Sequence, residues 1–270
     1  MLPSALTIAG SDPSGGAGLQ ADLKTFHTHR VYGMAVPTLI TVQNTHGVRR
    51  LELLSAELIA EQIAALFEDA PPRALKTGAL GGAAQVRAVA DVLSAQPALP
   101  WVIDPVCVSK TGAELLDAAG RRELVARLLP QAALFTPNLD EAALFLGQRI
   151  EREADIPQAA RALLSLGARA VLLKGGHREG EPVDVLCSAD GVHELRARRV
   201  HTRHTHGVGC SLSAAITARL ASGHDLLAAC SLAKQWLTRA LESAPGIGGG
   251  QGAIDHFAPL PEASQKTQTD

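Results

Sequence analysis

The chain has 270 residues, a formal net charge of −2 at pH 7 and only 3% aromatic residues. Proteins that bind nucleic acid usually need basic patches and stacking rings, so this composition argues against a nucleic-acid partner. The length lies near the size at which a single core stops growing, so we expect one domain over 1–260, followed by a polar, disordered tail over 261–270.

The cysteines and the hydropathy indicate a cytoplasmic protein. The four cysteines are widely spaced and form no Cys-x-x-Cys pair, which is typical of a reducing compartment. No apolar run approaches the roughly 20 residues of a membrane span, and no basic segment followed by an apolar stretch opens the chain. We therefore expect no membrane association.

Short apolar runs alternate with longer helical patterns. This alternation predicts an α/β fold whose mostly parallel central sheet is covered by helices on both faces. The predicted strands are 5–9, 35–42, 74–77, 101–104, 134–136 and 170–174. The predicted helices between them are 19–29, 56–67, 83–95, 114–129, 139–146 and 156–166.

The alternation changes after residue 174. Segments 183–187 and 192–197, joined across Ser188-Ala189-Asp190-Gly191, predict an antiparallel hairpin at a sheet edge. The basic run that follows, 196–199, is interpreted as a solvated strand edge. Two more helices are predicted, at 211–221 and 226–242.

Polar and glycine residues stand where predicted strands end. Gly10, Asp104, Thr136 and Lys174 each follow or close a strand, and Gln43 lies at the end of another. Ligands of open α/β sheets bind beyond the carboxyl ends of the strands. We therefore expect these residues to converge on one site.

A glycine turn precedes the predicted helix 211–221. Its sequence is Thr205-His206-Gly207-Val208-Gly209-Cys210. The glycines let backbone N–H groups point toward one place, and the helix start adds free donors and a positive dipole end, so an anion is expected there. A thiol at such a position has a lowered pKa, which predicts that Cys210 is a thiolate near neutral pH and can accept a proton. The alternative is an ordinary turn with a buried cysteine.

One further segment suits phosphate chemistry, and another marks the start of a helix. Lys174 precedes two glycines, so its ammonium group can neutralise a transferring phosphate; a lysine extending from a strand end is the alternative. Asn138 and Glu141 have the spacing of a capping box at a helix start.

Gln43 presents a donor and an acceptor side by side, which matches the ring nitrogen and exocyclic amine of an aminopyrimidine. A surface amide at a strand end is the alternative. The glycine-rich segment 10–18 is neither a Walker motif nor a clean dinucleotide fingerprint. The spacing of His201, His204 and His206 fits no standard zinc pattern, so zinc is not expected.

Four segments in the same order resemble one family, the hydroxymethylpyrimidine and phosphomethylpyrimidine kinases of thiamine biosynthesis, which have the ribokinase-like fold. They are Ala5 to Asp22, Thr136-Pro137-Asn138-Leu139-Asp140-Glu141-Ala142, Lys174-Gly175-Gly176-His177 and the glycine turn before Cys210. The resemblance runs from about residue 6 to 257. It implies phosphorylation by ATP, with Mg²⁺, of 4-amino-5-hydroxymethyl-2-methylpyrimidine and of its monophosphate.

The resemblance also implies a homodimer and assigns roles to individual residues. Those implied in catalysis are Cys210, Gly207, Gly209 and Lys174. Those implied in substrate binding are Gly10, Asp22, Gln43 and Val106. Those implied in ATP binding are Lys174, Thr205, Gly207, Val208 and Gly209. Those implied near Mg²⁺ are Asp104, Thr136, Asn138 and Glu141.

The chain departs from the family pattern at two positions. Val208 replaces a usual threonine and loses a hydroxyl bond to phosphate, while Ala79 replaces what is often a larger apolar residue. Two other functions compete with the pyrimidine kinase. One is a pyridoxine or pyridoxal kinase of the same fold, many of which have aspartate in place of Cys210. The other is a vitamin or nucleotide sensor without activity, against which the retained Cys210, Asn138 and Glu141 argue.

Overall fold

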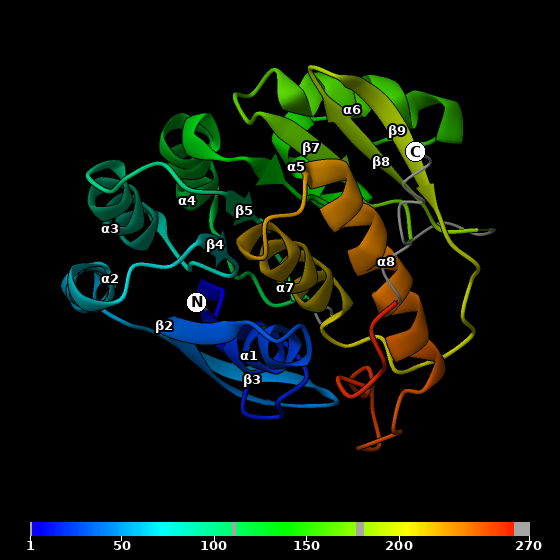
Figure 1. Ribbon diagram of the computed structural model, residues 1–270, viewed down its shortest axis with the longest axis horizontal. Coiled ribbons are helices and arrows are strands. Elements are labelled where there is room, and N and C mark those ends of the chain that lie inside the picture. Colours follow the sequence, from blue (N-terminus) through cyan, green and yellow to red (C-terminus); the bar gives the residue numbers. More distant parts are fainter. Residues whose placement is uncertain (1, 110–111, 177–180, 262–270) are drawn as a thin grey trace, which may run out of the picture.

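The computed structural model describes residues 2–109, 112–176 and 181–261. Nine strands form a sheet in the order β3-β2-β1-β4-β5-β6-β7-β8-β9 (Figure 1). The strands are β1 (Ser4–Ser11), β2 (Tyr32–Asn44), β3 (Gly47–Leu53), β4 (Ala74–Thr77), β5 (Trp101–Ile103), β6 (Leu134–Phe135), β7 (Ala170–Leu173), β8 (Val183–Ser188) and β9 (Gly191–Arg196).

The central strands are parallel and both edges are antiparallel. The pairs from β2 through β1, β4, β5 and β6 to β7 run parallel, whereas β7–β8 and β8–β9 are antiparallel. This confirms the predicted mostly parallel sheet and its edge hairpin. At the other edge, β2 also pairs antiparallel with β3, a strand that the sequence pattern did not predict.

Helices cover the sheet on both faces. They are α1 (Gly18–Thr28), α2 (Ala56–Asp69), α3 (Ala83–Ser94), α4 (Ala118–Glu123), α5 (Leu139–Leu146), α6 (Ile156–Leu164), α7 (Val208–Ala221) and α8 (Leu226–Glu242). A π-helical segment (Leu124–Leu128) and a 3-10 turn (Leu129–Gln131) extend α4. None of the helices in the described ranges is long and apolar enough to cross a bilayer.

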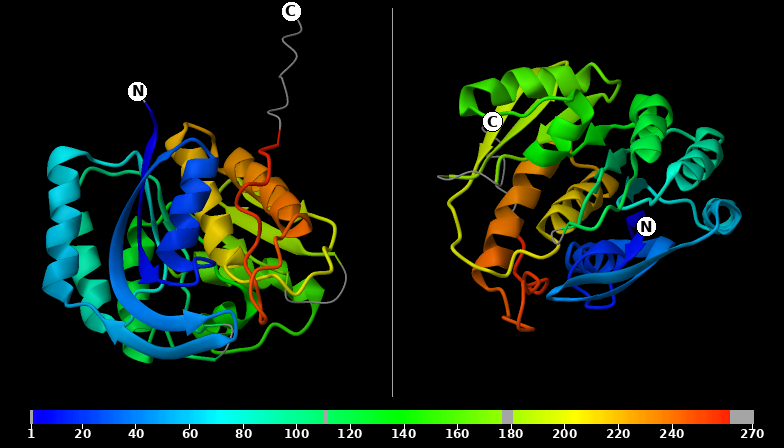
Figure 2. Two further views of the ribbon diagram at one scale, coloured as in Figure 1. Left: turned by 90° about the horizontal axis from the view of Figure 1, so that it is seen from below. Right: turned by 180° about the vertical axis from the view of Figure 1, so that it is seen from behind.

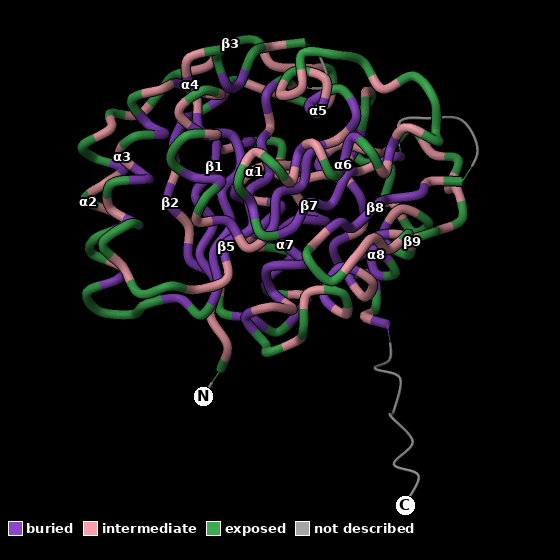
Figure 3. The backbone as a smooth tube through the Cα atoms, turned by 90° about the horizontal axis from the view of Figure 1, so that it is seen from above, coloured by how far each residue is buried: buried purple, intermediate pink, exposed green. Residues whose placement is uncertain are grey.

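Side chains that alternate along the strands pack on both faces of the sheet. On one face, Leu6 and Ile8 of β1 pack in the cluster that includes α2, α3 and α6. On the other face, Ala5 of β1 and Ala74 of β4 pack against α1 and α7. Because these two residues are small, α7 can approach the sheet closely, and Figure 3 shows its backbone among the buried segments.

β2 is longer than its parallel neighbour. Its last parallel pair with β1 joins Ile40 to Ser11, and it continues to Asn44 paired with β3. Figure 2 shows β2 as a long curved strand running past the end of β1. The β2–β3 hairpin therefore extends beyond the carboxyl ends of the parallel strands, where the site is expected.

Two helices begin more than two residues away from their predicted starts. The helix predicted from residue 114 begins at Ala118, because Asp117 caps it by accepting from the Gly120 amide, while Leu116 forms a bridge to Gly81. The helix predicted from residue 211 begins at Val208. His177 and residues 262–270 of the predicted tail lie outside the described residues.

Candidate active site

A cavity of about 440 Å³ lies at the carboxyl ends of the strands. This volume suits a small-molecule ligand. Most of the residues singled out from the sequence line it: Gly10, Gln43, Asp104, Val106, Asn138, Glu141, Lys174, Gly207, Val208, Gly209 and Cys210. The structure thus brings together segments that are far apart in the chain.

The start of α7 forms one wall of the cavity. Gly207 adopts φ 75°, and a Cβ atom there would overlap the carbonyl oxygen of Gly16 in the N-terminal loop. The first i→i−4 bond of this turn is donated by Ser211 to Gly207, so the amides of Val208, Gly209 and Cys210 precede it. This is the geometry of an anion site at a helix N-terminus.

Lys174 lies beside this turn. Its Nζ atom is 3.0 Å from Asp104 Oδ1, and a Cβ atom on Gly209 would lie 3.4 Å from the same Nζ. Burial lowers the pKa of Lys174, but Asp104 and Glu141 outweigh this effect and raise it above the ordinary value. Lys174 is therefore a fixed positive charge next to the helix N-terminus.

Asp104 is a buried, fully engaged carboxylate. Its Oδ1 accepts from Lys174 and, at 3.4 Å, from Thr136, while Oδ2 accepts from Ser213 at 3.1 Å. Burial acts to raise the pKa of Asp104, but the charges of Lys174 and Lys76 lower it below its usual range. Thr136 is itself fully buried and lies behind this carboxylate, outside the cavity wall.

The capping box at the start of α5 is present. The Glu141 amide donates to Asn138 Oδ1 and the Asn138 amide donates to Glu141 Oε2, both at 2.8 Å. Burial raises the pKa of Glu141, and the nearby charge of Lys174 opposes that rise only in part. Both residues also line the cavity, so capping and a role in the site are compatible.

The expected thiolate state of Cys210 is wrong for this structure. Burial raises the pKa of the thiol to about 11, although Lys76 and the Gly18 backbone amide act to lower it. Loss of solvent therefore outweighs the charge of Lys76 and the bond from Gly18. Cys210 lines the cavity as a thiol at neutral pH.

Asp22 does not reach the cavity wall. It is fully buried below it, where Oδ1 is 2.6 Å from Lys76 Nζ and Oδ2 accepts from Thr7. Lys76 Nζ also lies 3.5 Å from the Cys210 carbonyl oxygen. Asp22 is thus neither a ring contact nor a solvated helix residue, and Thr205 likewise lies outside the wall.

Gln43 belongs to a hydrogen-bond network that the sequence did not reveal. Its amide lies between His206 Nε2, at 3.1 Å, and Thr41 Oγ1, at 3.3 Å. His206 Nε2 is 2.7 Å from Asp12 Oδ2. In the sequence His206 is marked only by its place in the glycine turn, and its spacing from His201 and His204 fits no zinc pattern.

One wall of the cavity is apolar and tightly packed. Val106 has φ 27°, a strained value for a β-branched residue, and it packs with Leu39, Ala79 and Leu115. A Cβ atom on Gly10 would lie 2.6 Å from Leu39. A side chain at position 10 would therefore displace Leu39, and the wall as it stands can accept a flat ring.

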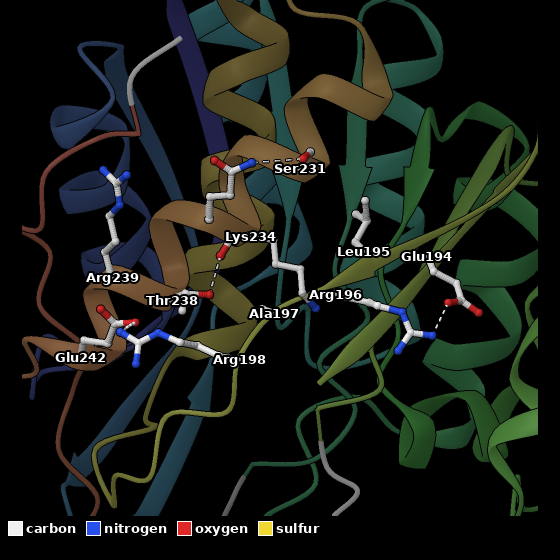
Figure 4. A pocket seen from close by; sticks show the side chains of 11 residues that line it. Glu194, Leu195, Arg196, Ala197, Arg198, Ser231, Lys234, Thr238, Arg239 and Glu242 are labelled. Atoms are coloured by element: carbon white, nitrogen blue, oxygen red, sulfur yellow. Dashed lines mark hydrogen bonds and ion pairs between the residues drawn. The ribbon is translucent and has the colours of Figure 1, made fainter. Parts of the chain in front are cut away.

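A second cavity, about 490 Å³, lies between β9 and α8 (Figure 4). Its charges are paired: Arg196 with Glu194 and Arg198 with Glu242, each at 2.6 Å. Lys234 pairs with buried Asp184, also at 2.6 Å. This pairing fits the solvated strand edge expected for 196–199.

The chain is similar to known kinases over nearly its whole length. The model of the phosphomethylpyrimidine kinase family matches residues 12–255. A hydroxymethylpyrimidine/phosphomethylpyrimidine kinase of Synechococcus elongatus is 46% identical over 261 residues, which cover 96% of this chain and 99% of the relative.

Two solved structures are similar over most of their length. The phosphomethylpyrimidine kinase of Clostridium difficile is 41% identical with a TM-score of 0.78, covering 88% of this chain and 99% of its own. The pyridoxal kinase of Bacillus subtilis, solved as an ADP complex, is 33% identical with a TM-score of 0.88, covering 96% and 98%. They confirm the fold class, and the chain belongs to the phosphomethylpyrimidine kinase family.

Proposed function

We propose that the protein transfers the γ-phosphoryl group of ATP to the hydroxymethyl group of 4-amino-5-hydroxymethyl-2-methylpyrimidine, and then phosphorylates the monophosphate, for thiamine biosynthesis. One observation supports this most strongly. The helix N-terminus of α7, suited to a phosphoryl group, and the Gln43 amide, suited to an aminopyrimidine edge, line the same cavity. The names of the Synechococcus and Clostridium relatives point to the same substrates.

ATP is the proposed phosphoryl donor. Lys174 and the amides of Gly207, Val208 and Gly209 would hold its phosphates, with Thr205 behind the turn. The Bacillus subtilis relative was solved with ADP, which supports an adenine nucleotide here. Val208 can contribute only its backbone, because it has no hydroxyl.

Mg²⁺ is proposed to bind with the nucleotide. Within 2–109, 112–176 and 181–261, no three His, Cys, Asp or Glu side chains gather closely enough to form a metal site by themselves. A cation that keeps several waters and binds phosphate oxygens suits this arrangement, since Asp104, Asn138 and Glu141 line one wall and Thr136 supports Asp104. When bound, Mg²⁺ would neutralise charge on the phosphates.

Direct in-line transfer follows from this arrangement. A bond forms between the hydroxymethyl oxygen and the γ-phosphorus, and the bond from that phosphorus to the leaving ADP oxygen breaks. The hydroxyl proton passes to the sulfur of Cys210 in its thiolate form. The buried cation Lys76 favours that form, although the thiol predominates at neutral pH.

Pyridoxal is the second candidate substrate. The likeness to the Bacillus subtilis pyridoxal kinase covers nearly the whole chain. Pyridoxal also presents a hydroxymethyl group on a nitrogen ring. It has no amine next to its ring nitrogen, however, and this is the pair of groups that Gln43 can bind.

The test is an assay of purified protein with Mg-ATP and the pyrimidine, its monophosphate or pyridoxal, each offered separately. We expect ADP release with the first two and a diphosphate product identified by mass. If pyridoxal is the only one of the three compounds that causes ADP release, the proposal is overturned in favour of a pyridoxal kinase. No release with any substrate would support a sensor without activity.

The homodimer, the cytoplasmic location and the single domain over 1–260 stay predictions. Sedimentation equilibrium of the full chain tests the first of them, with twice the 28.1 kDa chain mass as the expected result.

A further inference from the structure

Asp12 is a buried carboxylate whose position is fixed by the N-terminal loop. Its Oδ1 accepts from the amide and the hydroxyl of Ser14, and its Oδ2 accepts from the Ala17 amide at 2.9 Å. The Asp12 amide donates to Gln20. Burial acts to raise the pKa of Asp12, but the hydrogen bonds from His206 and Ser14 lower it below its ordinary value. Asp12 is therefore ionised.

The ionised Asp12 determines where His206 has a proton. Asp12 Oδ2 lies 2.7 Å from His206 Nε2. A ring nitrogen with a lone pair cannot face a carboxylate oxygen at this distance, so Nε2 must bear hydrogen and donate it. Nε2 then has no lone pair in the ring plane with which to accept a bond.

This proton determines the orientation of the Gln43 amide. The two ends of an amide are alike in size, so their partners decide which end is oxygen. If the Gln43 end that lies 3.1 Å from His206 Nε2 is the NH₂ group, two N–H groups face each other. With the oxygen toward His206, the Nε2–H of the histidine is shared between Asp12 and Gln43.

The contact of the other amide end with Thr41 independently indicates the same orientation of Gln43. Thr41 Oγ1 uses its single proton to donate to the Ser11 carbonyl at 2.9 Å. It lies 3.3 Å from Gln43 and can only accept a second bond there. The Gln43 end that faces Thr41 is therefore NH₂, and every group in the network has a compatible partner.

We infer that the pairs Asp12–His206 and Thr41–Ser11 fix the polarity of the Gln43 amide and thereby determine which hydrogen-bond pattern a substrate must present. This inference rests on the proposed function, since it concerns how the same cavity reads a pyrimidine. The Gln43 oxygen faces the α7 side of the cavity, and its NH₂ group faces the end of β1.

This polarity orients the substrate productively. In the aminopyrimidine, the amine lies between the hydroxymethyl carbon and the ring nitrogen. Pairing the amine with an oxygen on the α7 side places the hydroxymethyl group on that side too, toward Cys210. A reversed amide would pair with a turned-over ring and point the hydroxymethyl group away from α7.

A substrate with the opposite pattern provides the test. In 5-hydroxymethyl-2-methylpyrimidin-4(3H)-one, a carbonyl acceptor replaces the amine, and the ring N–H is a donor. Wild-type protein should prefer the amino compound by about 10- to 1000-fold in kcat/KM, because the oxo compound leaves two polar contacts mismatched. In His206→Leu only Thr41 still orients the amide, so the turned-over amide becomes more populated and this ratio should fall at least about tenfold.

Matched variants distinguish a changed orientation of the Gln43 amide from a general disturbance of the cavity. His206→Gln keeps a donor that can reach Asp12 and Gln43 and should retain the wild-type ratio. Thr41→Val should lower the ratio, whereas Thr41→Ser should keep it. Neither Thr41 variant alters the glycine turn of α7. KM for ATP should change by less than about threefold in all four.

The outcomes are distinguishable. If wild-type protein phosphorylates neither pyrimidine, the proposed function fails. If it phosphorylates the amino compound but both His206→Leu and Thr41→Val keep the wild-type ratio, the proposed function stands and this inference is wrong. Equal losses on both compounds in every variant, with KM for ATP raised, would assign these residues a purely structural role.

Discussion

Cys210 is the residue whose chemistry depends most on its surroundings. A helix N-terminus and Lys76 favour a thiolate, but burial dominates and raises the pKa of Cys210 to about 11. Below that pH the thiolate fraction increases about tenfold for each pH unit. If the thiolate accepts the substrate proton, kcat should rise from pH 7 to pH 10.

The matched variant is Cys210→Asp, since a carboxylate is already ionised at pH 7. Its kcat should be nearly independent of pH in this range, while Cys210→Ala should fold normally, lose roughly 10²–10⁴-fold in kcat at pH 10 and show no rise of kcat with pH. A wild-type kcat that does not change from pH 7 to pH 10, under conditions where chemistry limits the rate, would remove Cys210 as the base.

Glu141 caps α5 and also lines the cavity, and one substitution separates these two roles. A glutamine side chain at this position can still accept from the Asn138 amide, so Glu141→Gln should change the free energy of unfolding by less than about 1 kcal/mol. Its lost charge should raise the Mg²⁺ concentration needed for half-maximal activity. Glu141→Ala, the control, should lose about 1 kcal/mol through the cap as well. An unchanged Mg²⁺ titration in Glu141→Gln would leave Glu141 as a cap alone.

Single residues were predictable where local sequence decides their role. The Asn138–Glu141 spacing predicts the capping box, and the structure contains it. Asp22 and His206 were not predictable, because their partners Lys76 and Asp12 are distant in the chain and meet them only in the fold. The raised pKa of Cys210 was not predictable either, because it depends on the burial of the thiol, and a helix start in the sequence does not reveal burial.

At the level of elements, the turn into α7 depends on a contact between two glycine-rich loops. Gly207 has φ 75°, and a side chain there would overlap the Gly16 carbonyl oxygen. Gly207→Ala should therefore destabilise the protein by about 1–3 kcal/mol from backbone strain alone, with more from the clash. KM for ATP should rise strongly because the amides of the turn are displaced.

Gly223→Ala is the matched control for that substitution. Gly223 follows the other end of α7 with φ 90°, and nothing lies within 4 Å of a Cβ atom added there. Urea unfolding should detect a loss in both variants, whereas only Gly207→Ala should change KM for ATP. Equal kinetics for the two variants would argue against phosphate binding at this turn.

Elements with a clear apolar period were predicted best, whereas β3, which lacks one, was missed. Helices α5 and α8 match their predicted bounds. β3 was missed because Arg49, Arg50 and Glu52 interrupt its apolar residues and most of the strand is exposed. It is a strand because β2 continues past β1 and offers an open edge.

At the scale of the whole molecule, a buried ion pair links three elements below the cavity. Asp22 of α1 and Lys76 of β4 are both fully buried, and Lys76 approaches the Cys210 carbonyl of α7. Lys76→Met would leave Asp22 without its cation, so we expect a loss of about 3–5 kcal/mol in the free energy of unfolding. Lys76→Met with Asp22→Leu should recover much of that loss. Denaturation of both variants is the measurement, and an unrecovered loss would show that the pair is not an isolated unit.

The most direct test of the proposed function is a competition assay on wild-type protein. The pyrimidine and pyridoxal are supplied together at equal, low concentrations with Mg-ATP, and the initial ratio of the two phosphorylated products gives the ratio of their kcat/KM values. Because Gln43 can pair the amine and ring nitrogen of the pyrimidine alone, we expect the pyrimidine product to exceed the pyridoxal product by at least about tenfold. An excess of pyridoxal phosphate would contradict this account.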